Sequence, residues 1–242
     1  VPYLPSDPHT IALRMALDTA RAIKIETWRV GALADLAPHL PLDLRTIVLR
    51  AALDTARAIE NETWRVNALT GLAPHLPPDL LPTALAAACA IQREDARAEA
   101  LTGLAPHLPP DLLLTALAAA RAIEDQKQRI DALTGLAPHL PSDLLSAALD
   151  AACTIEWNDN SQADALTSLA PHLAAWAQQQ PEESYEAACN TLRTLAANPR
   201  PEFLRDLQAL LPFLMALVPE KDREQVAADI FHAIQDVTEW WP

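Results

Sequence analysis

The sequence predicts an all-α fold, a right-handed α-solenoid built from stacked helix–turn–helix repeats. The main observation is that the string Leu-Ala-Pro-His-Leu occurs five times, at intervals of 36, 32, 32 and 33 residues. A period in this range is typical of repeats such as those of TPR and HEAT proteins. The five copies begin at Leu36, Leu72, Leu104, Leu136 and Leu169.

Composition supports the same fold. Half of the residues are hydrophobic, mainly Ala and Leu, which are strong helix formers, and only 4 residues are Gly. The 21 Pro residues recur at fixed places in the repeat, so they mark the ends of helices rather than a disordered tract.

Each unit contains two helical patterns, and the fourth unit shows them clearly. We expect its first helix over residues 111–123 and its second over residues 126–139, because apolar residues recur every three or four positions. The same register holds in the other units. Its repeated core positions are Leu17, Leu53, Leu85, Leu117 and Leu149; Ala20, Ala56, Ala88, Ala120 and Ala152; and Ile23, Ile59, Ile91, Ile123 and Ile155.

The repeat has irregularities that predict local differences. The first two units carry four extra residues, so their first helices are expected to be about one turn longer. The fifth unit has one extra residue in the loop around residues 157–160. We therefore expect a solenoid of about five helix pairs over residues 1–173.

After Leu173 the pattern degrades, and residues 174–242 are predicted to form divergent capping helices. The expected helices span about residues 182–196, 202–217 and 221–240. Trp240 and Trp241 either seal the last layer or form an exposed aromatic contact for a partner.

Net charge limits the partners. A net charge of −14 argues against nucleic acid, whose binding needs a basic surface, and against anionic membranes. The partner is expected to be a protein or peptide. No signal peptide and no apolar run of ~18–20 residues is seen. The three widely spaced Cys indicate neither disulfides nor a CxxC metal site, and with them we expect a cytoplasmic location.

The sequence indicates no enzyme, cofactor or metal site. The repeated His residues are expected about 8–10 Å apart in stacked units, whereas ligands of one zinc ion lie ~2.0–2.1 Å from it. Cys89 and Cys153 stand in the position of Arg21, Arg57 and Arg121, with no base beside them, and are expected to be inert. The repeated His residues are His39, His75, His107, His139 and His172.

Positions that vary between repeats are the candidates for a ligand-binding face. One such stripe lies on the first helices and another on the second helices, and either one could line the concave surface. Trp and Arg in the first two units are residue types enriched in binding hot spots. The alternative is that the Arg residues form surface ion pairs and the Trp residues pack the longer helices. The candidates are Arg21, Trp28, Arg57, Trp64, Glu99, Arg121, Gln128 and Asp131.

The run from Leu104 to Leu113, followed by Ala116-Leu117 and the segment 119–123, resembles a helical repeat of large bacterial signalling proteins, the STAND-class NTPases. The segment 233–237 with Trp240-Trp241-Pro242 resembles the ends of such chains. The resemblance implies a C-terminal ligand-sensing region whose NTPase lies elsewhere in the polypeptide, since no GxxxxGK[ST] motif is present. We thus expect a macromolecule-binding module; the alternative is a structural scaffold or oligomerisation arm.

Overall fold

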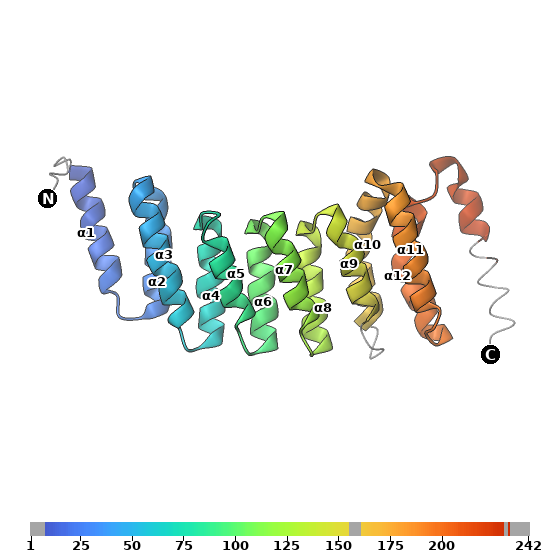
Figure 1. Ribbon diagram of the computed structural model, residues 1–242, viewed down its shortest axis with the longest axis horizontal. Coiled ribbons are helices and arrows are strands. Elements are labelled where there is room, and N and C mark those ends of the chain that lie inside the picture. Colours follow the sequence, from blue (N-terminus) through green and yellow to red (C-terminus); the bar gives the residue numbers. More distant parts are fainter. Residues whose placement is uncertain (1–7, 155–160, 230–231, 233–242) are drawn as a thin grey trace. The chain divides into compact units, whose positions relative to one another are not determined.

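The computed structural model describes residues 8–154, 161–229 and 232 (Figure 1). Within these residues all regular secondary structure is helical, and the predicted all-α repeat fold is confirmed. The chain forms two compact units, residues 1–120 and residues 121–242. The right hand of the superhelix stays a prediction.

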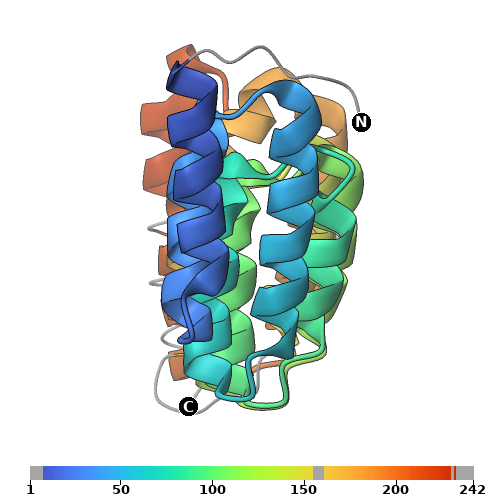
Figure 2. The same ribbon diagram turned by 90° about the vertical axis from the view of Figure 1, so that its left-hand side faces the viewer.

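The first unit holds three helix pairs and the helix that opens a fourth. Within each pair the helices pack on each other, and the second helices also form a row in which α2 contacts α4 and α4 contacts α6. Figure 2 shows the helices of this unit, coloured blue to green, side by side with their axes roughly aligned. The elements are α1 (Pro8–Ala22), α2 (Glu26–Leu36), η1 (Ala37–His39), α3 (Leu42–Ala58), α4 (Glu62–Leu72), η2 (Ala73–His75), α5 (Leu81–Cys89), α6 (Glu94–Leu104), η3 (Ala105–His107) and α7 (Pro110–Arg121).

The first four copies of the repeated motif each end the second helix of a pair in two steps. The α-helix stops at the first Leu, and Ala-Pro-His forms a 3-10 turn. The final Leu is extended, as at Leu40 with φ −87° and ψ 149°, because a following Pro disfavours the helical region. The expected helix over residues 126–139 is corrected accordingly: α8 (Gln126–Leu136) ends before the 3-10 turn η4 (Ala137–His139).

The core contains most of the residues that the register predicted, but Ile23, near the start of the array, is only partly buried. In the first unit, repeated Leu and Ala positions of the first helices are buried, which allows close packing of neighbouring helices. The extra turn is also confirmed, since α3 has 17 residues and α7 has 12. The buried positions include Leu17, Leu53, Leu85 and Leu117, with Ala20, Ala56, Ala88 and Ala120.

A row of arginines closes the turn inside each of the first four helix pairs. Arg29 donates from Nη1 to the Ile23 carbonyl over 3.2 Å, and Arg65 donates from Nε to the Ile59 carbonyl over 2.8 Å. Arg97 and Arg129 make the same bond to the carbonyls of Ile91 and Ile123, at 3.4 and 2.8 Å. These side chains satisfy carbonyls at the end of the first helix that would otherwise lack an intrahelical donor.

The second unit contains α8 and η4, followed by α9 (Ser142–Cys153), α10 (Ser161–Gln179), α11 (Pro181–Leu195), α12 (Arg200–Ala216), η5 (Glu220–Asp222) and helical residues 223–229. Helix α10 passes through Pro171 and continues beyond the predicted boundary at residue 173. The reason is local: Ala174 follows the last motif where Pro follows the others, so nothing forces the chain out of the helix.

The predicted capping helices 182–196 and 202–217 correspond to α11 and α12, which extend the packing of helix pairs. Helix α11 contacts α9, and α12 packs along α10. The rings of Trp176 and Phe213 stack between α10 and α12 with centroids 6.4 Å apart. Trp240, Trp241, Ile155 and the loop at residues 157–160 lie outside the described residues.

A buried polar network secures this last pair. Gln162 donates to the Cys153 carbonyl over 2.9 Å, and its own side-chain oxygen accepts from Asn198 over 3.1 Å. Asn198 also donates to the Asp206 carboxylate over 3.0 Å. Burial raises the pKa of Asp206, while the bond from Asn198 acts in the opposite direction. Each of these buried polar groups therefore has a partner, as a folded core requires.

Candidate functional site

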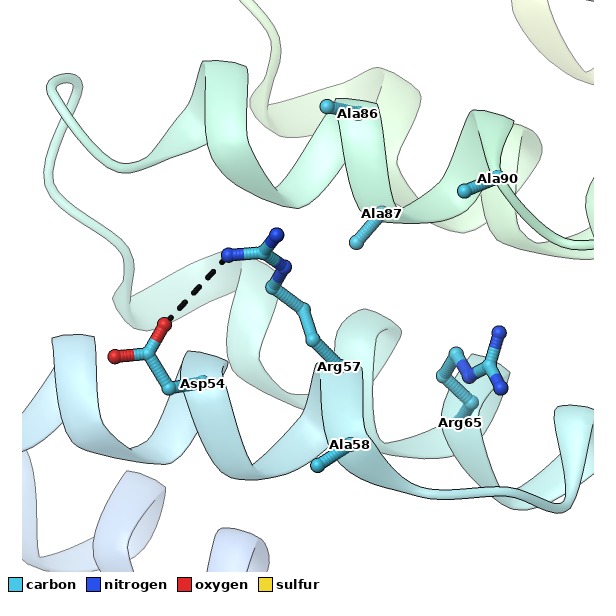
Figure 3. A pocket seen from close by; sticks show the side chains of 7 residues that line it. All are labelled: Asp54, Arg57, Ala58, Arg65, Ala86, Ala87 and Ala90. Atoms are coloured by element: carbon cyan, nitrogen blue, oxygen red, sulfur yellow. Dashed lines mark ion pairs between the residues drawn. The ribbon is translucent and has the colours of Figure 1, made fainter.

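Two grooves lie among the described residues of the first unit, on different pairs of helices. The larger lies between α3 and α5 and has a volume of about 410 Å³ (Figure 3). Its wall is built largely from alanine methyl groups, with one acidic and two basic side chains. The lining residues are Asp54, Arg57, Ala58, Arg65, Ala86, Ala87 and Ala90.

The charges of the α3–α5 groove are already paired or used. Arg57 forms an ion pair with Asp54, with 3.7 Å between Nη1 and Oδ1, and both side chains are more than half exposed. Figure 3 shows Arg57 reaching across the opening towards α5. Arg65 bonds the Ile59 carbonyl. An exposed pair of this kind contributes little free energy and no marked preference for one sign of charge.

The second groove lies between α2 and α4, in the row of second helices. Its volume is about 200 Å³. The floor consists of small residues, and one carboxylate, Asp35, stands on its wall. The lining residues are Thr27, Val30, Gly31, Ala34 and Asp35 from α2, with Asn67, Ala68 and Gly71 from α4.

Two exposed tryptophans stand at one end of the α2–α4 groove. Trp28 is 68% exposed and precedes Gly31 by three positions; Trp64 is 54% exposed and precedes Gly71 by seven. Positions separated by three or seven lie on one face of a helix, so Trp28 shares a face of α2 with Gly31, and Trp64 shares a face of α4 with Gly71. Asn61 fixes the start of α4, because its side chain accepts the backbone N–H of Trp64 over 3.1 Å.

The groove is open because of one residue. A methyl group added at Gly71 meets no atom within 4 Å, since the facing residue of α2 at the repeated position is Ala34. The next interface, between α4 and α6, places Thr70 at that position, and its side chain fills the space against Gly103. Ala34 is the exception in a column that otherwise holds Thr70, Thr102, Thr134 and Thr167.

The α4–α6 interface is also clamped at its other end. The Glu62 carboxylate accepts the backbone N–H groups of Gln92 and Arg93 over 2.8 and 2.9 Å. These two bonds lower the pKa of Glu62, because they stabilise its charged form. At the equivalent place in α2, Glu26 makes no such bond with the described residues. The α2–α4 interface therefore lacks both the threonine and the carboxylate contact that close the α4–α6 interface.

The structure separates the predicted ligand-face residues onto different surfaces. Arg57 lines the α3–α5 groove, whereas Trp28 and Trp64 stand on α2 and α4, the two helices that form the other groove. The two grooves share no lining residue. Arg21 is exposed at the end of α1, and Glu99 is exposed on α6. Arg121, Gln128 and Asp131 belong to the second unit, on α7 and α8. As binding residues, all eight stay predictions.

The described part of the chain contains no group of three His, Cys, Asp or Glu side chains placed to hold a metal ion. Burial raises the pKa of the Cys153 thiol to about 12 and also raises that of Cys89, so both stay protonated at neutral pH. All three cysteines are free. No helix in residues 8–154 or 161–229 is both long and apolar enough to cross a bilayer.

Two features of the site depend on contacts that the repeat pattern does not reveal. The arginines of the row recur at one position of the repeat, but their role depends on side chains that fold back onto the preceding turn. The opening between α2 and α4 depends on Ala34, which breaks the column of threonines. That exception was visible in the aligned repeats, but its meaning required knowing that Gly71 faces it.

Comparisons of the chain with family models, with curated proteins and with solved structures gave no match.

Proposed function

We propose that the chain is a protein-binding repeat module whose partner docks on the α2–α4 groove. The observation that carries this proposal is the pair of exposed tryptophans beside an open groove on two helices in direct contact. Tryptophan is among the residues most enriched in binding hot spots, which form where a large ring packs next to a pocket.

The equivalent positions in other repeats support a role for the tryptophans in binding a partner rather than in packing the repeat. At the equivalent place in the third pair the residue is Ala96, which is buried, so the repeat does not need a large ring there. Trp28 and Trp64 expose most of their surface rather than packing the core. Burying such rings against a partner removes a large apolar area from water.

The size of the groove favours a protein partner over a small molecule. Pockets for drug-sized ligands typically have volumes of about 300–1,000 Å³. A groove of about 200 Å³ takes one or two side chains of a docked segment. We assign the chain, by its resemblance to STAND-class repeats, to the sensor region of a larger bacterial signalling protein. Its free thiols are compatible with the cytoplasm.

The proposal is tested by panning a library of random displayed peptides against the chain. The expected result is enrichment on the wild type and its loss on the double variant Trp28→Ala with Trp64→Ala. Both side chains are exposed, so the variant is expected to keep the helical circular dichroism and the Tm of the wild type.

A matched control is Tyr185→Ala, which removes an aromatic ring that is 63% exposed on α11. Enrichment should persist on this variant. No enrichment on the wild type would contradict the proposal, and so would equal enrichment on the double variant. Concentration-dependent self-association in light scattering, without enrichment, would favour the scaffold alternative.

A further inference from the structure

We propose that the segment bound at the α2–α4 groove is basic, with Lys or Arg side chains against Trp28, Trp64 and Asp35. This inference rests on the proposed function and names the chemistry of the partner. Three observations carry it: the sign of the charges on the row of second helices, the two exposed rings, and their distance along the helix from Asp35.

Two carboxylates on this row, Asp35 and Glu99, have no cationic partner among the described residues. Asp35 lines the groove, and Glu99 is exposed on α6 at the position that Gly31 and Asn67 occupy in the first two pairs. Neither carboxylate forms an ion pair with the described residues. The net charge of the whole chain, −14, adds an attractive field for a basic segment.

The basic residues of the same helices point elsewhere. Arg29, Arg65 and Arg97 are the only Lys or Arg residues of α2, α4 and α6, and each bonds a carbonyl at the end of the preceding helix. Their charges are thus held at the turn inside each pair. A basic partner therefore meets no competing cation from these helices at Asp35 and Glu99.

The rings of Trp28 and Trp64 also favour a positively charged partner. A Lys ammonium or an Arg guanidinium over the face of an aromatic ring is attracted by the ring quadrupole, most strongly for Trp. The α3–α5 groove differs, because Arg57 already pairs with Asp54 there. Of the two grooves, only the one between α2 and α4 combines a carboxylate that has no ion pair, Asp35, with tryptophans on the helices that form it.

The spacing fits a short extended segment. Trp28 and Asp35 are seven residues apart on α2, which is about 10 Å along the helix axis. A segment in the polyproline II conformation covers about 9 Å in three residues, and side chains three residues apart lie on the same side of it. Two basic side chains about three residues apart can therefore reach the tryptophans and Asp35 at the same time.

The test reads the charge of the peptides enriched in the panning experiment. Enriched sequences are expected to carry an excess of Lys and Arg over the starting library. Synthetic versions should bind the wild type roughly fivefold more tightly than Asp35→Asn in fluorescence anisotropy, because a partly exposed ion pair is lost. Asp54→Asn, which removes a carboxylate of the other groove, should leave their affinity unchanged.

The outcomes separate this inference from the proposed function. Enrichment of neutral or acidic peptides that depends on Trp28 and Trp64 would overturn the inference and leave the proposed function standing. Basic peptides whose affinity is the same for the wild type and for Asp35→Asn would also overturn it. Absence of any enrichment would remove the proposed function and this inference with it.

Discussion

Two neighbouring interfaces in the row of second helices have nearly the same sequence and different structures. Between α4 and α6, Thr70 fills the space beside Gly103 and the Glu62 carboxylate holds the next turn. Between α2 and α4, Ala34 leaves a groove of about 200 Å³ beside Gly71. The change from Thr to Ala therefore opens a site without disturbing the repeat.

The comparison shows how a repeat protein separates stability from recognition. The repeated Leu and Ala core is the same at both interfaces, so the helices stack in either case. The positions that close an interface lie outside that core, and they are free to vary. The tryptophans appear at the open interface, whereas the third pair has the buried Ala96 at that position.

The largest predicted effect is destabilisation by Gly103→Ala. The added methyl group would lie 3.1 Å from Thr70 Cβ and overlap its Cγ2. Rotation of the threonine is opposed by its hydroxyl, which donates to the Val66 carbonyl over 2.9 Å. We expect a loss of about 1–2 kcal/mol in the free energy of unfolding, measured with urea, since overpacking outweighs the helix propensity gained.

A double-mutant cycle locates that clash. Thr70→Ala alone should destabilise the chain by about 1 kcal/mol, through the lost methyl group and hydrogen bond. In its presence Gly103→Ala should cost nothing further, giving a coupling free energy of about 1–2 kcal/mol. Additive losses in the urea unfolding of the three variants would show that the two residues do not compete for space.

Gly71→Ala should have the opposite sign to Gly103→Ala. The methyl group enters open space, and Ala is favoured over Gly in a helix, so the free energy of unfolding should rise by about 0.5–1 kcal/mol. Adding Ala34→Thr should cancel this gain, because a threonine would then face an alanine, as Thr70 does in the Gly103→Ala variant. A gain that survives the second substitution would show that residue 34 does not face residue 71 in the way that Thr70 faces Gly103.

The smallest predicted effect concerns Glu62, whose carboxylate holds the turn before α6. Because the folded pKa of Glu62 is lowered, its stabilisation is present above the ordinary Glu pKa of about 4.3 and disappears as pH falls through the lower value. The carboxylate is screened by solvent, so Glu62→Gln should cost only about 0.2–0.5 kcal/mol at neutral pH. This difference should vanish in acid, and Glu26→Gln, the matched control, should show none.

The sequence was sufficient for the repeat and its core, because Leu53 and Ala56 recur with their equivalents at a fixed spacing that also sets their burial. It was not sufficient to predict which surface of the protein each exposed side chain lies on. Arg57 and Trp64 both vary between repeats, yet which groove each lines depends on how a helix is rotated against its neighbour. The continuation of α10 beyond residue 173 could be predicted from the sequence, since Ala174 stands where other repeats have Pro.

The measurement that tests the account most directly is the affinity of an enriched peptide for Ala34→Thr. Threonine at this position is expected to fold as it does at residue 70, so the Tm should change little while the groove closes against Gly71. The account predicts at least roughly tenfold weaker binding, equivalent to about 1.4 kcal/mol. Unchanged affinity in a folded variant would contradict the claim that the α2–α4 groove is the binding site.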